Sequence, residues 1–445
     1  MKNMKINAIV LMGTAILFSQ SVVKADEVQS PQKDKRSVRD TIVDITKPEA
    51  KEHENVDSVD EMFSYAKVSG NIETIYSYHD EKSGHSPYST DVGGQLKYEL
   101  AKFKGFGAGV EFTTSRSINA LTGDDERENT FISSPDGSYT QMSQAYLEYK
   151  YEDFDLKVGR QLIDTPLADS DDYRIINNTF EAAIATYDLS DFSLMLGYLD
   201  RWQGTDAGLD VDNPWQETGK DGTYFGSVAY ENGNFSTSAW YYDISATDPL
   251  TNTLGQNVAN KTAYIDGAVE FPLNDTLEVH LNAQYVNQST QENSDIEASI
   301  YGFLVELQID EALTFGLAYN NSEKQTGKGS FSGFGGGTLF TSMDNMILDN
   351  ITLDRDASAV VAGFTYGLGD FSFLYAYGDF DGDADSLGEK EHIIEQNIGT
   401  EYAATENLVF SAIIVIDDDK EDSGSGAYYD DGDFTNYRLA VNYHF

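Results

Sequence analysis

The stretch FTNYRLAVNYHF, residues 434–445, reads as a β-strand with two different faces. Its apolar and aromatic side chains fall on one face, namely Tyr437, Leu439, Val441, Tyr443 and Phe445. Its polar side chains fall on the other face, because successive side chains of a strand point to opposite sides. Such strands occur in soluble sandwiches and in membrane barrels. The stretch predicts a β-fold but does not distinguish these two architectures.

The same two-faced strand recurs along the chain from residue 63 onward. Eight times an alternating strand is followed by a short turn rich in Asn, Asp, Gly or Pro, and then by a second alternating strand. QLKYELAKFKGFGAGVEF (95–112) and AGFTYGLGDFSFLYAY (362–377) are two examples. With an opening strand at 67–78 and a closing strand at 435–445, these hairpins predict 18 strands.

The connections between the hairpins are long, irregular and rich in Asp, Gly, Ser and Asn. They include residues 117–139, 162–179, 201–221 and 320–356. Short turns that alternate with long loops are typical of outer-membrane barrels, whereas the connections of a sandwich do not sort into two length classes. We therefore expect an all-β transmembrane antiparallel barrel with 18 strands, short periplasmic turns and long extracellular loops.

The chain before the barrel is expected to contain two segments. Residues 1–25 have the weakly basic start, apolar run and small residue (Ala25) of a secretory signal peptide. Residues 26–62 are charged and without sustained periodicity, which predicts a mostly disordered periplasmic leader. Within 56–65 a plain linker is favoured over a short helix, and the barrel is expected to occupy 63–445.

The composition limits the function classes. The chain has no cysteine, so thiol redox chemistry and disulfides are excluded. It has 75 acidic and 29 basic residues, with a formal net charge of −46. This charge repels nucleic acid and attracts cations. We expect an integral protein of the outer membrane of a Gram-negative bacterium, in contact with lipid and lipopolysaccharide.

Two stretches resemble the OprD-type family of outer-membrane porins. LKVGRQLIDTPLADSDDYRIINNTFEAA (156–183) looks like the third-loop region of that family, and MFSYAKVSGNIETIYSY (62–78) resembles the first strand of its epsilonproteobacterial members. The resemblance implies an 18-strand channel for small solutes such as amino acids or small organic acids. It also implies a third loop inside the lumen that forms the constriction with Asp164, Thr165, Pro166, Asp169, Asp171, Asp172 and Arg174.

One departure from the family concerns arginine. Members that carry basic amino acids or carboxylates use a ladder of lumen-facing arginines, and this chain has only nine Arg in all. The substrate class of the best-known members is therefore not carried over.

Strand alternation predicts which charged side chains face the lumen, namely Lys97, Glu99, Glu111, Glu148, Lys157, Arg160 and Arg438. A transverse field between basic residues on one wall and the acidic third loop is one interpretation, and structural ion pairs are the other. Because acidic residues outnumber basic ones, we expect a weak to moderate preference for cations.

Aromatic and glycine-rich segments give three further expectations. Tyr443 and Phe445 resemble the terminal signal that the barrel-assembly machinery reads. Aromatic girdles at the strand ends are expected to contain Trp202, Trp215, Trp240, Tyr198, Tyr241 and Tyr242. The GFGGG segment at 333–337 does not follow a strand and open a helix, which predicts a mobile loop and no phosphate site.

Two acidic stretches, 379–391 and 417–433, are expected in outer loops. Ca²⁺ or another divalent cation could bridge them to each other or to lipopolysaccharide phosphates, but a solvated acidic rim is favoured. No cofactor or firm metal site is expected. The carboxylates that would bridge are Asp379, Asp381, Asp383, Asp417, Asp418 and Asp419.

A passive porin is the favoured function, because the lumen faces are polar and no plug domain precedes the first strand. The alternative is a structural or surface-binding barrel with incidental conductance. No enzyme is expected, because no nucleophile motif is present. A homotrimer stays open, since trimers are common among porins although every sector of the predicted wall is compatible with lipid.

Overall fold

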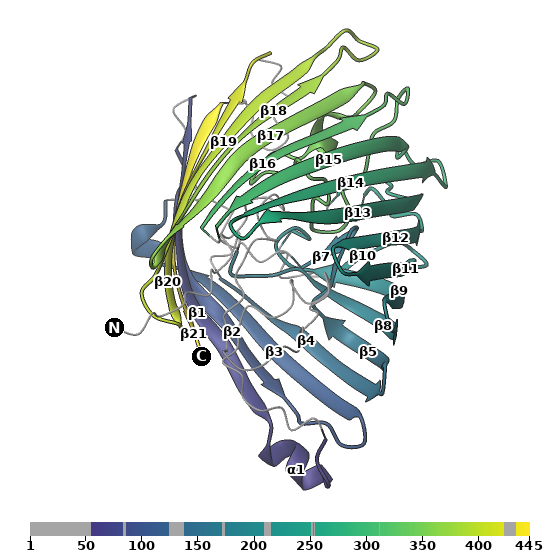
Figure 1. The fold of residues 1–445 in the computed structure, drawn as a ribbon, viewed down its shortest axis with the longest axis vertical. Helices are drawn as coiled ribbons and strands as arrows, with labels where there is room; N and C mark the ends of the chain where they lie inside the picture. The colour runs from purple at the N-terminus through teal and green to yellow at the C-terminus, as the bar shows by residue number, and fades with distance from the viewer. Residues whose placement is uncertain are drawn as a thin grey trace.

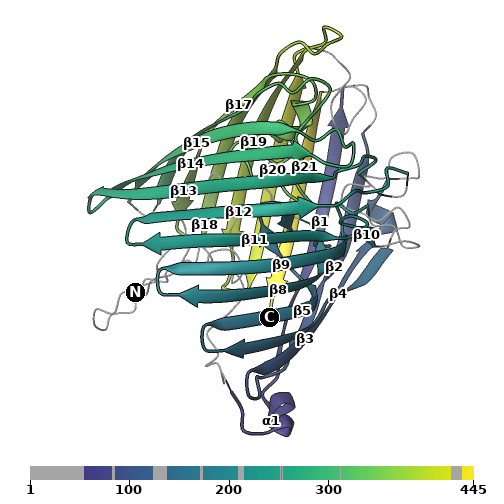
Figure 2. The ribbon, with the colours of Figure 1, turned by 90° about the vertical axis from the view of Figure 1, so that its right-hand side faces the viewer.

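The computed structural model describes residues 55–82, 86–123, 138–170, 174–208, 215–250, 252, 254–310, 312–421 and 433–445. The predicted signal peptide and most of the predicted leader lie outside the described residues. The described chain forms a closed antiparallel barrel of 18 strands with almost no helix, as the alternation predicts. The ring of strands is seen in Figure 1, and its side wall in Figure 2.

Eighteen strands build the wall. They are β1 (Lys67–Glu81), β2 (Tyr88–Glu99), β3 (Phe106–Ser117), β4 (Ser138–Tyr151), β5 (Phe154–Gln161), β8 (Thr179–Leu189), β9 (Phe192–Gln203), β11 (Thr223–Asn232), β12 (Phe235–Ile244), β13 (Asn260–Asn274), β14 (Leu277–Thr290), β15 (Ala298–Ile309), β16 (Leu313–Ser322), β17 (Ala357–Leu368), β18 (Phe371–Gly382), β19 (Glu391–Ala403), β20 (Leu408–Asp419) and β21 (Phe434–His444).

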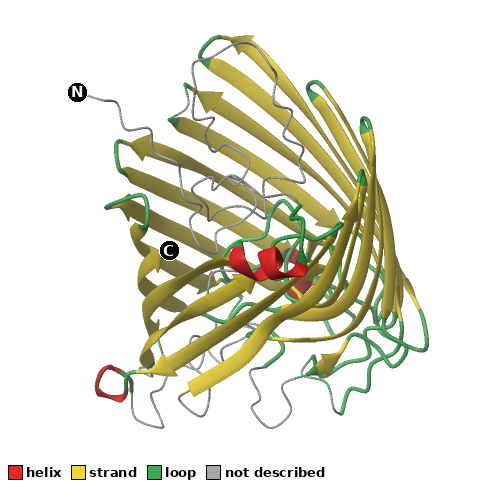
Figure 3. Cartoon of the chain, turned by 90° about the horizontal axis from the view of Figure 1, so that it is seen from below, coloured by secondary structure: helices red, strands yellow, loops and turns green. Residues whose placement is uncertain are grey.

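The remaining elements are short. β10 (Gln216–Glu217) extends the sheet beside β9, and β6 (Asp164–Thr165) and β7 (Ala168–Asp169) form a separate two-stranded hairpin. Helical segments are α1 (Val59–Ser64), η3 (Asn119–Leu121) and η4 (Leu348–Ile351). Figure 3 shows how small the helical part of the described chain is.

The last strand closes the ring by pairing with the first. The register joins Ile72 to Tyr443 and Thr74 to Val441. Gly70 and Phe445 exchange two backbone hydrogen bonds, with N–O distances of 3.0 and 2.9 Å. The terminal aromatic residue is therefore part of the ladder, which removes both sheet edges, as a barrel in an apolar medium requires.

The two faces of the wall differ as strand alternation predicts. On β2 the outward side chains Val92, Leu96 and Tyr98 are exposed, and on β3 so are Phe106 and Phe112. The inward positions carry polar groups, many of them buried. The apolar residues thus form the outside of a closed ring and not the shared interior of two stacked sheets, which excludes the sandwich.

The expectation for the aromatic girdles is wrong for several residues. Trp202 and Tyr242 are almost fully buried and belong to an apolar cluster inside the barrel, and Trp240 packs against it. Tyr241, the neighbour of Tyr242, is half-exposed on the outer face. For Tyr242 the reason is that adjacent residues of a strand point to opposite faces. Trp202 faces inward because a bulge at Asp200 shifts the register of β9.

The preference for a plain linker before the barrel is wrong for residues 59–64, which form α1. Ser58 caps this helix by accepting a hydrogen bond from the Glu61 N–H, while the Glu61 carboxylate accepts one from the Asp57 N–H at 2.8 Å. Ser58 thus satisfies one free N–H group of the first turn, and the Glu61 carboxylate holds the residue before the cap. Within the described residues, no helix is long and apolar enough to cross a bilayer.

Candidate pore constriction

Two loops from the same end of the barrel fold into its interior. We call residues 162–178, between β5 and β8, loop L3, and residues 323–356, between β16 and β17, loop L7. L3 contains the β6–β7 hairpin, which Figure 1 shows inside the ring of strands. Asp171 and Asp172, two of the predicted constriction residues, lie outside the described residues.

The structure brings several predicted constriction residues together in the β6–β7 hairpin. Asp164 pairs with Asp169 across it, and Pro166 stands at its turn. The Thr165 hydroxyl donates to the Ala168 carbonyl at 3.1 Å, which closes the turn. Beyond the hairpin, the Arg174 guanidinium lies 3.7 Å from the Asp206 carboxylate.

L3 meets L7 along a seam of backbone hydrogen bonds. The Phe334 N–H donates to the Leu167 carbonyl, and the Asp169 N–H donates to the Phe334 carbonyl, both at 3.0 Å. The Thr338 hydroxyl donates to the Pro166 carbonyl. Phe334 is fully buried and its ring contacts the Trp202 ring, so water is excluded from the side of the seam that faces Trp202.

Glycine at position 333 makes this seam possible. Its φ is +105°, which side chains rarely tolerate, and a Cβ there would lie 2.7 Å from the Leu167 Cα. A Cβ at Gly336 would lie equally close to the Asp169 side chain. The predicted mobile loop at 333–337 is therefore a packed contact, and its glycines allow two backbones to approach.

The tip of L7 reaches the wall formed by β19, β20 and β21. Both carboxylate oxygens of Asp344 accept a hydrogen bond from the same Arg438 nitrogen, and the one to Oδ2 is 2.7 Å long. Both side chains are almost fully buried. The Met346 N–H donates to Glu395 at 2.6 Å, and the Asn345 amide donates to Asp417 at 2.7 Å. L7 is thus tied to three neighbouring strands by charged hydrogen bonds, which are stronger than neutral ones.

Apolar packing completes the anchoring of L7. Its side chains form one buried cluster with the inward residues of β13–β19. The members that L7 contributes are Leu339, Phe340, Met343, Met346, Leu348 and Ile351. This cluster occupies part of the ring, so a solute path must run along the remaining, polar part of the lumen.

One arc of that polar lumen carries paired basic residues. Lys97 lies 3.0 Å from Glu99. The Lys157 ammonium stands 4.5 Å from the centre of the Tyr146 ring. The remaining contacts in this arc join Lys102 to Glu148 at 3.2 Å, and Arg160 and Arg201 to the two oxygens of Glu181 at 2.9 and 2.7 Å. These basic groups belong to β2, β5, β9 and the turn after β2.

The opposite arc, from β15 to β20, carries buried carboxylates. Glu306 is 2 % exposed, and neither of its carboxylate oxygens has a hydrogen-bond partner among the described residues. Glu401 and Glu395 on β19 and Asp417 on β20 are buried as well. Glu111, by contrast, lies in the basic arc and accepts hydrogen bonds from Ser143 and Gln144 at 2.7 and 2.9 Å.

The acidic residues predicted at the outer rim do not share one surface. Asp417 faces inward and binds Asn345, whereas Asp379 contacts His392 at 3.2 Å and Asp418 pairs with Lys420. In the described part of the chain, no group of three or more His, Asp or Glu side chains could hold a metal ion. Bridging by a divalent cation stays a prediction.

Sequence reasoning missed the role of L7. It did not identify its anchors Glu395 and Asp417, or the Glu181 that joins Arg160 to Arg201. Two signals were available: the connection 320–356 is long, and it contains closely spaced glycines that suit a tight backbone contact. Among the described residues, Arg438 pairs with Asp344 of L7.

Comparison with known proteins supports the fold. No protein-family model matches the chain, and no curated protein is similar to it by sequence. Solved structures do match: OccAB2 of Acinetobacter baumannii has 17 % identity and a TM-score of 0.71, covering 86 % of this chain and 99 % of that one. OpdK of Pseudomonas aeruginosa, solved with vanillate, has 16 % identity and a TM-score of 0.68, covering 86 % of this chain and 99 % of that one. OpdQ of the same organism has 16 % identity and a TM-score of 0.67, covering 87 % of this chain and 99 % of that one.

These neighbours are OprD/Occ porins. At such low identity the likeness concerns the fold, and the epsilonproteobacterial branch stays a prediction. The closed ring, the 18 strands and the near absence of helix among the described residues match those structures. The chain therefore has the 18-strand barrel fold of the OprD/Occ porins.

Proposed function

We propose that the protein is a porin of the outer membrane of a Gram-negative bacterium, through which small hydrophilic solutes and ions diffuse passively. The observation that carries this proposal is a closed ring with an apolar outside and a charged lumen that two inward loops narrow. An apolar outer face suits lipid, and a polar lumen of this strand number suits a water-filled path. Amino acids and small organic acids are the solute classes that the resemblance implies.

We further propose that the L3–L7 seam sets the size of the pore and that the lumen favours cations. The basic groups of the arc from β2 to β9 are mostly paired with carboxylates. Acidic residues outnumber basic ones by 75 to 29 in the whole chain, so we expect a net negative charge beside the path. The predicted field between a basic wall and the acidic third loop stays a proposal. Rings of acidic side chains favour cations in channels.

Conductance across a planar bilayer tests the channel, and the reversal potential in a KCl gradient tests its ion preference. We expect open steps in current and a reversal potential of the sign that indicates cations. Glu181→Gln leaves Arg160 and Arg201 without their shared carboxylate and should reduce this preference. Glu406→Gln, in the exposed turn between β19 and β20, should leave it almost unchanged. A reversal potential that indicates anions would contradict the cation preference.

The dry L3–L7 seam favours a second candidate function, a structural or surface-binding barrel with incidental conductance. The same bilayer experiment separates the two. The second function is favoured if the full-length protein inserts but carries no current, while a variant whose L3–L7 contact is disrupted, such as Gly333→Val, conducts. For either function we propose lipid, lipopolysaccharide and the assembly machinery as partners, the last through the exposed Tyr443 and Phe445.

A further inference from the structure

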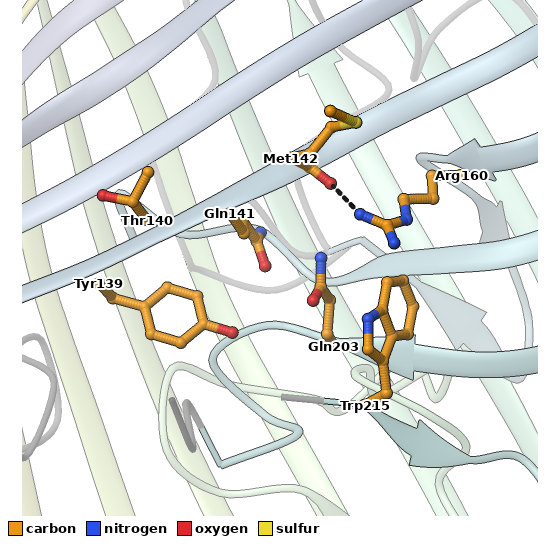
Figure 4. A pocket seen from close by; sticks show the side chains of 7 residues that line it. All are labelled: Tyr139, Thr140, Gln141, Met142, Arg160, Gln203 and Trp215. Atoms are coloured by element: carbon orange, nitrogen blue, oxygen red, sulfur yellow. Dashed lines mark hydrogen bonds between the residues drawn. The ribbon is translucent and has the colours of Figure 1, made fainter. Parts of the chain in front are cut away.

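A pocket of about 250 Å³ lies where β4 runs past the end of β5, apart from the L3–L7 seam. Three elements of the wall and the segment before β10 contribute to it. Its lining residues are Tyr139, Thr140, Gln141, Met142, Arg160, Gln203 and Trp215 (Figure 4).

The floor of the pocket includes a free strand edge. β4 pairs with β5 only from Ala145 onward, so that in the described structure residues 138–144 are paired with β3 alone. The Met142 carbonyl points away from β3, because it accepts a hydrogen bond from Arg160 at 3.4 Å. By the alternation of an antiparallel strand, the N–H and C=O of Thr140 point to the same side. This edge offers a donor and an acceptor to a ligand.

Two side-chain amides reach into the same space. Gln141 and Gln203 are 6 % and 2 % exposed, and Figure 4 shows their amide ends pointing toward one another. The Gln141 Oε1 and the Gln203 Nε2 have no hydrogen-bond partner within the described structure. A buried polar group without a partner is costly, and native structures rarely leave two in one place. The Gln141 oxygen and the Gln203 nitrogen are therefore available to accept from and donate to a ligand.

The charges around the pocket limit what this group can be. Arg160 and Arg201 share one carboxylate, Glu181, and both guanidinium centres lie 4.7 Å from the centre of the Trp215 ring. The net positive charge of this triad disfavours a cationic ligand. The Gln141 oxygen disfavours a carboxylate beside it, and a flexible polyol loses more conformational freedom on binding than a planar amide does. A neutral, planar group with one acceptor and one donor fits best.

We propose that this pocket binds small neutral solutes that carry a carboxamide or peptide group. The carbonyl of such a group accepts from Gln203, and its N–H donates to Gln141. A longer peptide unit can continue along the free edge of β4, which is how extended peptides add to open sheets. The proposal deepens the proposed function by naming a solute class, and it rests on that function only for the statement that the bound solute is transported.

Calorimetric titration of the detergent-purified full-length protein with N-acetylglycinamide tests the proposal. We expect saturable binding that Gln203→Leu and Gln141→Leu each weaken by about 3- to 10-fold, the effect of one lost hydrogen bond. Gln308→Leu, on β15 and outside the pocket, should bind as the unmodified protein does. If the leucine variants fail to assemble, Gln203→Asn removes the same contact with a smaller change.

Charged and hydroxylated probes complete the test. Acetate, glycinamide and glycerol should each bind more weakly than N-acetylglycinamide. Equal affinity in all variants, or binding of any of these three probes at least as tight as that of the amide, would overturn the proposal. Ion conductance without ligand is measured separately. A conducting protein that does not bind the amide contradicts this inference alone, whereas a protein that binds the amide but never conducts contradicts the proposed function.

Discussion

L3 and L7 enter the same lumen but are held there by different forces. L7 has its own anchors, namely the Asp344–Arg438 ion pair, the carboxylates of β19 and β20, and a buried apolar cluster. L3 is held by apolar packing of its hairpin against the wall around Trp202, by hydrogen bonds from Gln95 and Gln141 to Asn177, and by the contacts with Phe334 of L7. The comparison teaches that a buried ion pair and charged hydrogen bonds fix L7, whereas L3, although its sequence is the more recognisable, is fixed mainly by apolar packing and neutral hydrogen bonds.

The largest expected effect comes from removing the anchor of L7. Arg438→Met leaves Asp344 buried without its partner, and breaking a buried ion pair in this way costs about 3–5 kcal/mol. We expect a lower free energy of unfolding in urea and larger current fluctuations. Arg116→Met, at an exposed position of β3, is the control. If the tip of L7 stays in place and the current is unchanged, the anchor is not the ion pair.

Next in size is a change in the seam itself. Gly333→Val introduces a side chain at positive φ, which costs about 1–3 kcal/mol, and also a clash with the Leu167 backbone. We expect the loops to separate and single-channel conductance to rise.

Gly388→Val serves as the matched control for the seam variant. Gly388 has a φ of +89°, but no atom lies within 4 Å of the position that a Cβ would take there, so this variant has the backbone strain without the clash. Equal conductance changes in the two valine variants would mean that strain, and not the seam, controls the current.

A smaller effect is expected within L3. Thr165→Val keeps the shape of the side chain but removes the hydrogen bond to the Ala168 carbonyl, which contributes about 1 kcal/mol. We expect more frequent brief current fluctuations at nearly unchanged mean conductance. Thr237→Val removes a hydrogen bond from Thr237 to the Asp266 carbonyl, away from both loops, and should leave the current unaltered. Current fluctuations as large as those of Arg438→Met would contradict this order of effects.

The smallest effect concerns the outer end of L7. Hydrogen bonds from Ser386 and from the Gly327 N–H lower the pKa of Asp354 to about 2. Because the pKa is depressed in the folded protein, the stabilisation is complete above the ordinary value of about 3.9 and is lost as the pH falls through about 2. Hydrogen exchange of the Gly327 and Ser386 amides should therefore gain protection as the pH rises through this window, beyond the intrinsic pH dependence. In Asp354→Asn this additional dependence should be absent.

Local pattern accounts for the part of the fold that was predicted correctly. Side chains of a strand alternate between two faces, so the outward positions of β2 and β3 and the eight hairpins could be assigned from spacing alone. The same rule, applied more strictly, would have placed Tyr242 inside, whereas Trp202 faces inward because a bulge at Asp200 shifts the alternation of β9. The candidate site was less accessible, because Asp344 and Arg438 are distant in the chain and no periodicity relates a loop residue to the strand that it reaches.

The sequence by itself determined a closed ring of 18 two-faced strands with a terminal strand that completes it, since alternation and turn residues act over neighbouring positions. Only the tertiary structure decided which loops narrow the lumen, which charges are paired and where β4 keeps a free edge. These features depend on contacts between distant segments, in which burial and hydrogen bonding select one arrangement among many that the local pattern allows.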